Sequence, residues 1–307
     1  MKKKILIVSG GFSKEREISK KTAKSVFKEL KNHSNYDVEI CEPDGNLVNK
    51  LKKFKPNVVF NALHGQYGED GYIQSIFEKE GFSYTHSGVA ASALAIDKEL
   101  SKKIFIKNKI LTPKYLKYKF VEKTDKVELR KKLKKKIKFP IVIKPINEGS
   151  SVNVYICNEK NFYSKLNKLR EYHEVLIEEY IPGREIQAAI MGVKKLGAIE
   201  LKPKRKFYDY KAKYETSAKT EHIIPVPINK KQYKKLMDTA LKAHKIIGCK
   251  GITRCDFRFY KNKFYLLEIN TQPGLTTLSL VPEIAKYNNI SFSNLIQWII
   301  TDASKNR

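Results

Sequence analysis

Acidic, basic and amide side chains alternate along two neighbouring apolar segments near the carboxyl end of the chain. Arg254 and Asp256 lie on the first segment, and Glu268 and Asn270 on the second. Because side chains alternate faces along a strand, the members of each pair point to the same side. Two carboxylates and an amide oxygen are hard ligands that suit Mg²⁺ or Mn²⁺. The pattern predicts a divalent-metal site on a β-hairpin if the two strands pair so that all four side chains share one face.

The register depends on the turn between the two strands. A three-residue loop, 261–263, would place Asp256 opposite Glu268. It would also place Arg254 opposite Asn270, so that all four side chains share one face. A two-residue loop would put the two pairs on opposite faces. A surface ladder of ion pairs has the same spacing, so spacing alone leaves both interpretations open.

A second polar group follows an apolar, β-branched segment in the middle of the chain. Lys144 ends that segment, and Gly149, Ser150 and Ser151 form a short turn soon after it. Such a turn offers backbone N–H groups to a phosphate, and the lysine adds a positive charge. The segment resembles a phosphate-binding turn, although glycine and serine are also common at strand ends that bind nothing.

Two further candidates lie in the N-terminal part. Ser13 is expected to cap the first helix, with Glu15 in its first turn, where a carboxylate also complements the helix dipole. His64 stands where an apolar strand meets Gly65, at the crevice position of parallel α/β sheets. Each residue is a candidate for substrate binding, and each also has an ordinary structural explanation.

An α/β framework must position these residues. The first hundred residues alternate short apolar segments with helical patterns, which is typical of a parallel α/β layer. The following segments mix helices and strands, as α+β structure does. We therefore predict three parts, which are residues 1–96, 97–181 and 182–307, with a polar segment at about 202–221.

The chain is globular by composition and strongly basic. Its 307 residues are 41% hydrophobic and 30% charged, and 61 Lys and Arg against 32 Asp and Glu give a net charge of +29. Such a charge suggests anionic partners. The lysines are spread along the chain, and the one dense run, 131–138, favours a solvated helix face over a nucleic-acid patch. We predict no nucleic-acid partner, and a lysine-rich nucleic-acid-binding protein is the alternative from a different class.

Several site types are excluded by inspection. The dipeptide Gly-Lys never occurs, which excludes a Walker-type phosphate loop, and the turn at 9–13 lacks the third glycine of a dinucleotide-binding motif. The four cysteines show neither paired spacing nor a zinc-ligand pattern. No apolar run reaches the length of a membrane span or of a signal-peptide core. We expect a cytoplasmic protein with no membrane partner.

Seven blocks of sequence occur in order along nearly the whole chain. They are residues 10–17, 62–71, 87–98, 143–152, 207–214, 254–256 and 268–282. Together these blocks resemble the D-alanine:D-alanine ligase family of the ATP-grasp superfamily. Three positions depart from the family pattern, where a glycine often replaces Asn153 and His86 and a glutamate often replaces Lys211.

The resemblance implies an N-terminal parallel α/β domain that binds substrate, followed by an ATP-grasp fold of two α+β subdomains. It implies an ATP-dependent ligase that joins two D-alanines through an acyl phosphate for peptidoglycan precursor synthesis. Two Mg²⁺ or Mn²⁺ ions would be held by Asp256, Glu268 and Asn270. The residues that would bind ATP are Lys98, Lys144, Ser150, Ser151, Glu178, Glu179, Tyr180, Ile181, Glu185 and Lys213.

The resemblance also implies which residues would bind each of the two D-alanine substrates. Glu15, assisted by His64, would bind the ammonium group of the first D-alanine. Ser279 and Leu280 would bind the carboxylate of the second.

The remaining implied roles concern the reaction itself. Arg254 and the backbone N–H of Gly274 would form an oxyanion hole. The segment 202–221 would act as a lid, from which Tyr214 bonds toward Ser150 and Glu15. Members that form a D-lactate ester carry Phe in place of this Tyr, so a relative that uses D-serine or D-lactate as second substrate is the alternative within the family. A homodimer is expected.

Overall fold

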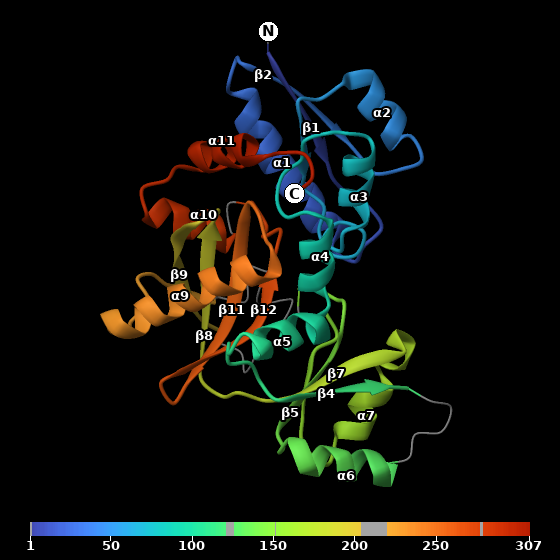
Figure 1. Ribbon diagram of the computed structural model, residues 1–307, viewed down its shortest axis with the longest axis vertical. Coiled ribbons are helices and arrows are strands. Elements are labelled where there is room, and N and C mark those ends of the chain that lie inside the picture. Colours follow the sequence, from blue (N-terminus) through green and yellow to red (C-terminus); the bar gives the residue numbers. More distant parts are fainter. Residues whose placement is uncertain (1, 121–125, 151, 204–219, 277–278) are drawn as a thin grey trace.

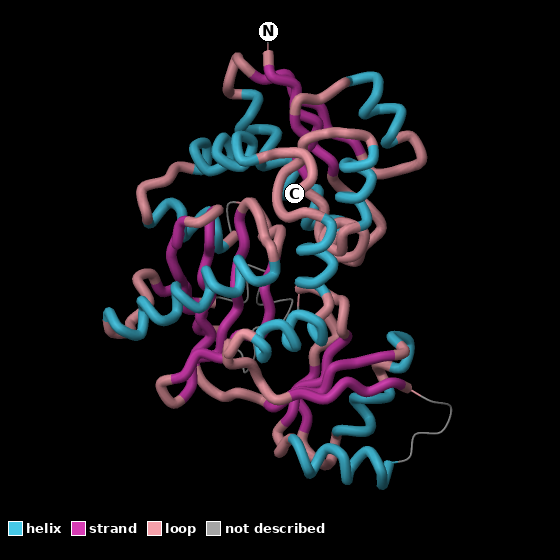
Figure 2. The backbone as a smooth tube through the Cα atoms, in the orientation of Figure 1, coloured by secondary structure: helices cyan, strands magenta, loops and turns pink. Residues whose placement is uncertain are grey.

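The computed structural model describes residues 2–120, 126–150, 152–203, 220–276 and 279–307 (Figure 1). Three sheets lie one after another along the molecule, and helices cover them (Figure 2). Within the described residues, no helix is both long and apolar enough to cross a membrane.

The N-terminal part is the predicted parallel α/β layer, with strand order β2-β1-β3. Its elements are β1 (Lys3–Val8), α1 (Arg16–Lys31), β2 (Tyr36–Cys41), α2 (Leu47–Phe54), β3 (Val58–Asn61), α3 (Tyr72–Lys79) and α4 (Val89–Ile96). Residues 5–8 of β1 are fully buried because helices cover both faces of the sheet.

The central part contains a four-stranded antiparallel sheet of order β4-β7-β5-β6. Its elements are α5 (Lys98–Lys107), β4 (Tyr115–Lys119), α6 (Lys126–Lys136), β5 (Ile141–Pro145), β6 (Tyr155–Cys157), α7 (Phe162–Asn167), η1 (Arg170–Tyr172) and β7 (Glu174–Glu179). Helix α6 buries Leu129 and Leu133, and its described lysines are exposed, as the prediction of a solvated face requires.

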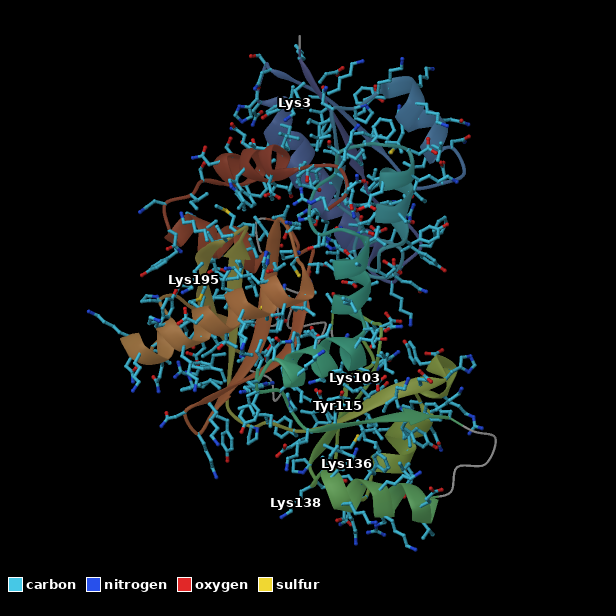
Figure 3. All side chains as sticks on the ribbon, viewed as in Figure 1. Lys3, Lys103, Tyr115, Lys136, Lys138 and Lys195 are labelled. Atoms are coloured by element: carbon cyan, nitrogen blue, oxygen red, sulfur yellow. The ribbon has the colours of Figure 1, made fainter. Side chains whose placement is uncertain are left out.

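Lysine side chains are distributed over the whole molecule and do not form one stripe. In Figure 3, Lys3, Lys195 and Lys138 lie in three different parts of the molecule. The positive charge of the chain is therefore spread over separate surfaces.

The C-terminal part contains a five-stranded antiparallel sheet of order β10-β9-β8-β11-β12. Its elements are β8 (Arg184–Met191), β9 (Lys194–Lys202), β10 (Glu221–Ile223), α9 (Lys230–Ile247), β11 (Ile252–Tyr260), β12 (Lys263–Asn270), α10 (Leu280–Tyr287) and α11 (Phe292–Asp302). Helix α9 begins after a capping box in which Asn229 and Gln232 bond each other's backbone.

The two faces of the C-terminal sheet have different neighbours. One face packs against α9, α5 and α4 through Ile186, Cys255 and Ile269. The other face carries the polar residues of the predicted metal site, and its apolar remainder shares a core with α10, α11 and the N-terminal sheet. The site therefore lies on the side of the sheet that faces the N-terminal part.

Candidate active site

The hairpin of β11 and β12 has a two-residue turn, so the three-residue loop on which we based the register is wrong. Tyr260 pairs with Lys263, and the residues between them, Lys261 and Asn262, have φ values of 46° and 59°. Positive φ at both central positions is characteristic of a type I′ turn, whose twist suits a hairpin.

A β-bulge restores the predicted pairing beyond this turn. The register shifts by one residue between Asp256 and Phe257, and β12 contributes the extra residue. Asp256 therefore lies opposite Glu268, and Arg254 lies opposite Asn270. The shared face is as predicted, but it results from a bulge and not from the turn.

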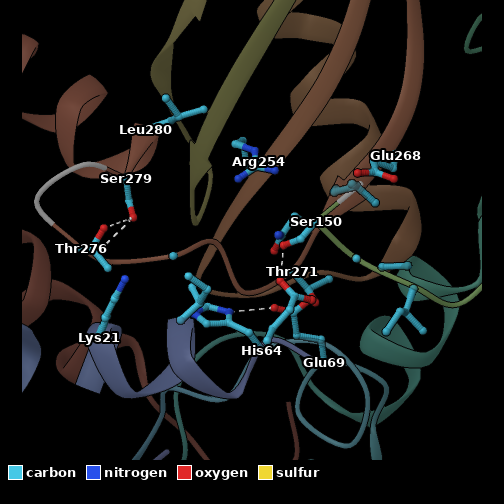
Figure 4. Close-up of a pocket in the computed structure, with 18 of the residues that line it drawn as sticks. Lys21, His64, Glu69, Ser150, Arg254, Glu268, Thr271, Thr276, Ser279 and Leu280 are labelled. Atoms are coloured by element: carbon cyan, nitrogen blue, oxygen red, sulfur yellow. Dashed lines mark hydrogen bonds and ion pairs between the residues drawn. The ribbon is translucent and has the colours of Figure 1, made fainter. Parts of the chain in front are cut away.

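A cavity of about 430 Å³ collects residues from all three parts of the chain (Figure 4). The predicted site residues that line it are Glu15, His64, Lys98, Ser150, Arg254, Glu268, Asn270, Gly274, Ser279 and Leu280. The set predicted for the amino acids and the oxyanion thus surrounds one space.

A second cavity of about 70 Å³ adjoins the first and shares Lys98, Glu148 and Glu268 with it. The predicted residues that line it are Lys98, Lys144, Glu178, Glu179, Tyr180, Ile181, Glu185, Asp256 and Glu268. The set predicted for the nucleotide gathers here. Ser151, Lys211, Lys213 and Tyr214 lie outside the described residues, as does most of the predicted lid, 204–219.

The ends of the predicted lid segment lie side by side in one sheet. Lys202, at the end of β9, pairs with Glu221, at the start of β10. The segment therefore leaves and re-enters the fold at adjacent positions on the edge of the C-terminal sheet.

Arg254 and Asp256 form a two-point ion pair on β11. Arg254 Nε donates to Asp256 Oδ1 at 2.7 Å, and its Nη2 donates to Oδ2 at 3.0 Å. Such bidentate geometry fixes the plane of the guanidinium group. Glu268 lies beside them, with its Oε2 3.6 Å from Lys98 Nζ. Positive and negative groups therefore alternate across this face.

Lys98 is placed by the start of α5. The Asp97 side chain caps this helix by accepting from the backbone N–H groups of Glu99 and Leu100, each at 2.9 Å. The first helical residue, Lys98, then points toward the phosphate turn, where its Nζ donates to the backbone oxygen of Glu148 at 2.5 Å.

Glu15, and not Ser13, is the residue at the N-cap position of α1, so the expected cap is wrong. The Ser13 hydroxyl instead links two chain segments, since it accepts from Glu15 N at 3.1 Å and donates to His64 O at 2.6 Å. The buried Glu15 carboxylate accepts a hydrogen bond from Ser150 Oγ. A Cβ at Gly149 would lie 2.6 Å from Glu15 Oε2, so glycine is needed for this close approach.

His64 is buried between α1 and the loop that carries Glu69. Its Nδ1 donates to Glu69 Oε1 at 2.9 Å, and its Nε2 lies 3.0 Å from Thr22 Oγ1. Burial lowers the pKa of His64, but the hydrogen bond and charge of Glu69, with the charge of Glu15, outweigh burial and raise the pKa above its ordinary value. The imidazole is held in one orientation at the floor of the cavity.

Ser279 and Leu280 are placed by the start of α10. Ser279 is its N-cap residue and Leu280 its first helical residue. Ser279 Oγ accepts from Thr276 N at 3.0 Å, which holds the loop before the helix against the cavity. In Figure 4 Lys21 lies on the same side of the cavity as Thr276 and Ser279.

Sequence reasoning missed Lys102, which lies beneath the smaller cavity. It is fully buried on α5, its Nζ lies 3.0 Å from Glu178 Oε2, and it donates to Thr112 Oγ1 at 2.7 Å. Lys144 Nζ approaches the other oxygen of Glu178 at 2.7 Å. The signal was present, because Lys102 follows Lys98 by one helical turn and shares its face.

Two members of this buried triad, Lys102 and Glu178, have shifted pKa values. Burial lowers the pKa of Lys102 to about 8, although the carboxylate of Glu178 opposes that effect. Burial alone would raise the pKa of Glu178, but the charges of Lys102 and Lys144 outweigh it and lower that pKa. The three groups therefore carry a net positive charge below the smaller cavity when all are ionised.

Two of the three departures from the family pattern occur at left-handed backbone positions. Asn153 has a φ of 55° and His86 a φ of 70°. Asparagine tolerates this conformation better than most residues do. The turn after Ser150 therefore keeps the backbone that a glycine would provide.

Comparison with known proteins shows the family of the chain. The family model of the D-ala D-ala ligase C-terminus matches residues 109–301. A D-alanine–D-alanine ligase of Pelagibacter ubique (strain HTCC1062) is 63% identical over the full length of both chains. The chain belongs to the D-alanine–D-alanine ligase family. A family member from Wolbachia pipientis wMel is 47% identical over 99% of this chain and 95% of its own.

Solved structures of the D-alanine–D-alanine ligase family share the fold. The Bacillus anthracis enzyme complexed with ATP has a TM-score of 0.83 at 29% identity, covering 97% of this chain and 96% of that one. The VanG D-Ala:D-Ser ligase of Enterococcus faecalis has a TM-score of 0.82 at 26% identity, covering 98% and 99%. The predicted α/β domain followed by an ATP-grasp fold is confirmed, and the nucleic-acid-binding alternative is not supported.

Proposed function

We propose that the two cavities together join two D-alanines into D-alanyl-D-alanine with ATP, the activity of the family to which the chain belongs. A carboxylate does not form an amide directly, because its oxygen is a poor leaving group. Transfer of a phosphoryl group from ATP gives an acyl phosphate, and phosphate then leaves with that oxygen. The observation that carries the proposal is the meeting of Glu15, Ser150, Arg254 and Glu268 around one cavity.

The nucleotide would occupy the smaller cavity. Lys98 and Lys144 would neutralise its phosphates, and residues 178–181 would face the adenine ring. Glu185, which lies 3.1 Å from Arg258 Nη2, would reach the ribose hydroxyls. A pair of unit charges at 4 Å is worth about 4 kcal/mol at an effective dielectric of about 20, so each lysine contributes strongly to binding a triphosphate.

The metal ligands would be Asp256, Glu268 and Asn270. Their oxygens suit Mg²⁺ or Mn²⁺, which when bound would neutralise phosphate charge. In the part of the chain that the structure describes, no cluster of three His, Cys or acidic side chains could hold an ion alone. Two ions would therefore need phosphate and water oxygens as well as these side chains, which fits ions that arrive with ATP.

The larger cavity would hold both amino acids. Glu15 would bind the ammonium group of the first D-alanine, with His64 supporting it, and Ser279 with Leu280 would bind the carboxylate of the second. Arg254 and the N–H of Gly274 would donate to the oxygen that gains charge in the tetrahedral intermediate.

The roles of Ser151, Lys213 and Tyr214 remain predictions, since these residues lie outside the described part of the chain. Closure of the lid over the acyl phosphate would exclude the water that hydrolyses it. A homodimer and a cytoplasmic location are also predictions.

ADP release by the purified protein with Mg-ATP tests the proposal. D-alanine is compared with L-alanine, D-serine, D-lactate plus D-alanine, and no acceptor, and mass spectrometry identifies the product. We expect ADP in equal amount to D-alanyl-D-alanine with D-alanine alone. A mixed D-alanyl-D-serine product in preference to the homodipeptide would instead show a D-serine ligase.

A further inference from the structure

Gln187 is a buried amide that no described residue satisfies. It lies on β8, is 1% exposed and lines the larger cavity. Within the described part of the chain, neither its Nε2 nor its Oε1 has a hydrogen-bond partner. An unpaired buried amide lowers the stability of a fold, because it has lost its bonds to water without gaining others.

The strand register places Gln187 in the row of the predicted metal ligands. It lies opposite Asp256 on β11, which lies opposite Glu268 on β12. Directly opposed residues of antiparallel strands share a face with Cβ atoms about 4.5–5.5 Å apart. The three side chains therefore form one line across the sheet.

Asp256 does not use the amide of Gln187. Both carboxylate oxygens of Asp256 accept from Arg254. On its other side, Gln187 pairs with Ile199, whose side chain is apolar. The amide is therefore left without a partner among the described residues, on a side chain that lines the larger cavity.

The neighbours of Gln187 on β8 indicate what it faces. Two residues before it, Glu185 lies opposite Arg258, and two residues after it, Ala189 lies opposite Arg254. In the proposed function Glu185 marks the ribose end of ATP and Arg254 the reacting carbon. Gln187 lies between them. It lines the larger cavity and not the smaller one, so of the nucleotide only the phosphoryl group transferred toward the amino acid would come within its reach.

We propose that Gln187 is a further substrate-binding residue, whose Nε2 donates a hydrogen bond to an oxygen of the phosphoryl group transferred from ATP. A neutral amide can donate without adding a third carboxylate to the row of Asp256 and Glu268. This inference rests on the proposed function and extends the site by one residue.

The test compares wild type with Gln187→Leu, which keeps the size and removes both polar atoms. Affinities for β,γ-imido-ATP and for AMP are measured by calorimetry with Mg²⁺ present. We expect about tenfold or greater weakening for the imido-triphosphate, as for loss of a hydrogen bond to a charged group, and an unchanged affinity for AMP. Thermal unfolding without ligand should be unchanged or shifted to higher temperature, because an unsatisfied amide has been removed.

Two further variants make the test decisive. Gln187→Glu keeps the shape but removes the donor and adds a negative charge, so it should weaken imido-triphosphate binding more than Gln187→Leu does. Gln74→Leu is the matched control, since Gln74 is equally buried, lies outside both cavities and donates to Gly68 O at 2.8 Å. It should lower the unfolding temperature and leave nucleotide affinity unchanged.

Three results would overturn the inference. They are unchanged affinity in Gln187→Leu or Gln187→Glu, equal loss for AMP and the imido-triphosphate, and a lower unfolding temperature for Gln187→Leu. Failure of the proposed function is distinguishable, because it would appear in wild type as absence of the dipeptide product.

Discussion

The two adjoining cavities are built in different ways. Beneath the smaller one, Lys102, Glu178 and Lys144 are buried and already paired with one another. Around the larger one, polar groups come from distant parts of the chain, and Gln187 has no partner among the described residues. Hence the ion pairs beneath the smaller cavity form without a ligand, whereas the larger cavity has in Gln187 a buried amide without a partner among the described residues.

The largest expected effect is on the larger cavity. Arg254→Ala should lower turnover by on the order of 10² to 10³, because it removes a donor aimed at the developing negative charge. Steady-state ADP release measures it. Arg254→Lys keeps the charge but cannot form the two-point bond to Asp256, so it should recover only part of the rate. Wild-type turnover in Arg254→Ala would contradict the oxyanion role.

The next largest effect should be on the stability of the protein, through the buried ion pairs beneath the smaller cavity. Lys102→Met removes one of the two cations that hold Glu178, and we expect the free energy of unfolding to fall by about 2–3 kcal/mol. Lys103→Met is the control, since Lys103 makes an exposed ion pair with Glu99. That control should change stability by less than about 0.5 kcal/mol. Urea denaturation compares them, and equal losses would show that burial of Lys102 is unimportant.

The pH dependence of His64 provides a sharper test of the larger cavity. Its folded pKa is raised, so its contribution to stability is present below about pH 6.5 and is lost as pH rises through the folded pKa. In Glu69→Gln burial should dominate and lower that pKa. The contribution would then be present above about pH 6.5 and lost as pH falls.

NMR titration of the His64 ring measures this reversal directly. Glu17→Gln changes an exposed carboxylate on α1, serves as control and should leave the titration unchanged. A His64 pKa that stays raised in Glu69→Gln would show that another group holds the proton.

The smallest effect on stability should come from substitutions at Asn153, in the turn that follows Ser150. Asn153 has a φ of 55° and donates from Nδ2 to Tyr172 Oη at 2.8 Å. Asn153→Ala should cost about 1–2 kcal/mol, since alanine tolerates the left-handed region poorly, and Asn153→Gly should stay within about 0.5–1 kcal/mol of wild type. Thermal unfolding ranks the three proteins, and an alanine variant as stable as wild type would rule out a backbone requirement.

The larger cavity was more predictable from sequence than the network beneath the smaller one. Two recognisable strands each carry two of the polar residues, which are Arg254 and Asp256 on one and Glu268 and Asn270 on the other. Because the members of each pair are two residues apart, the alternation of side chains places each pair on one face of its strand. Lys102 carries no such signal beyond its helical spacing from Lys98. Most lysines in this chain are exposed, and only tertiary packing shows that this one is buried.

The hairpin of β11 and β12 has a pairing that local sequence patterns alone do not predict. Chain order and alternation determined that the four polar residues would lie on two adjacent strands. The turn has two residues, which by itself would have placed the pairs on opposite faces. A bulge between Asp256 and Phe257 reversed that outcome. A bulge depends on packing against neighbouring strands, which no window of sequence contains.

The amino-acid sequence by itself determined the fold class and the family, and it singled out many of the residues that line the two cavities, because these depend on residue type, period and order. The tertiary structure decided the register of the hairpin, the burial of Lys102 and the unpaired amide of Gln187. Each of these depends on residues far apart in sequence approaching within a few ångströms, where burial and pairing change the energy of the same side chain by several kcal/mol.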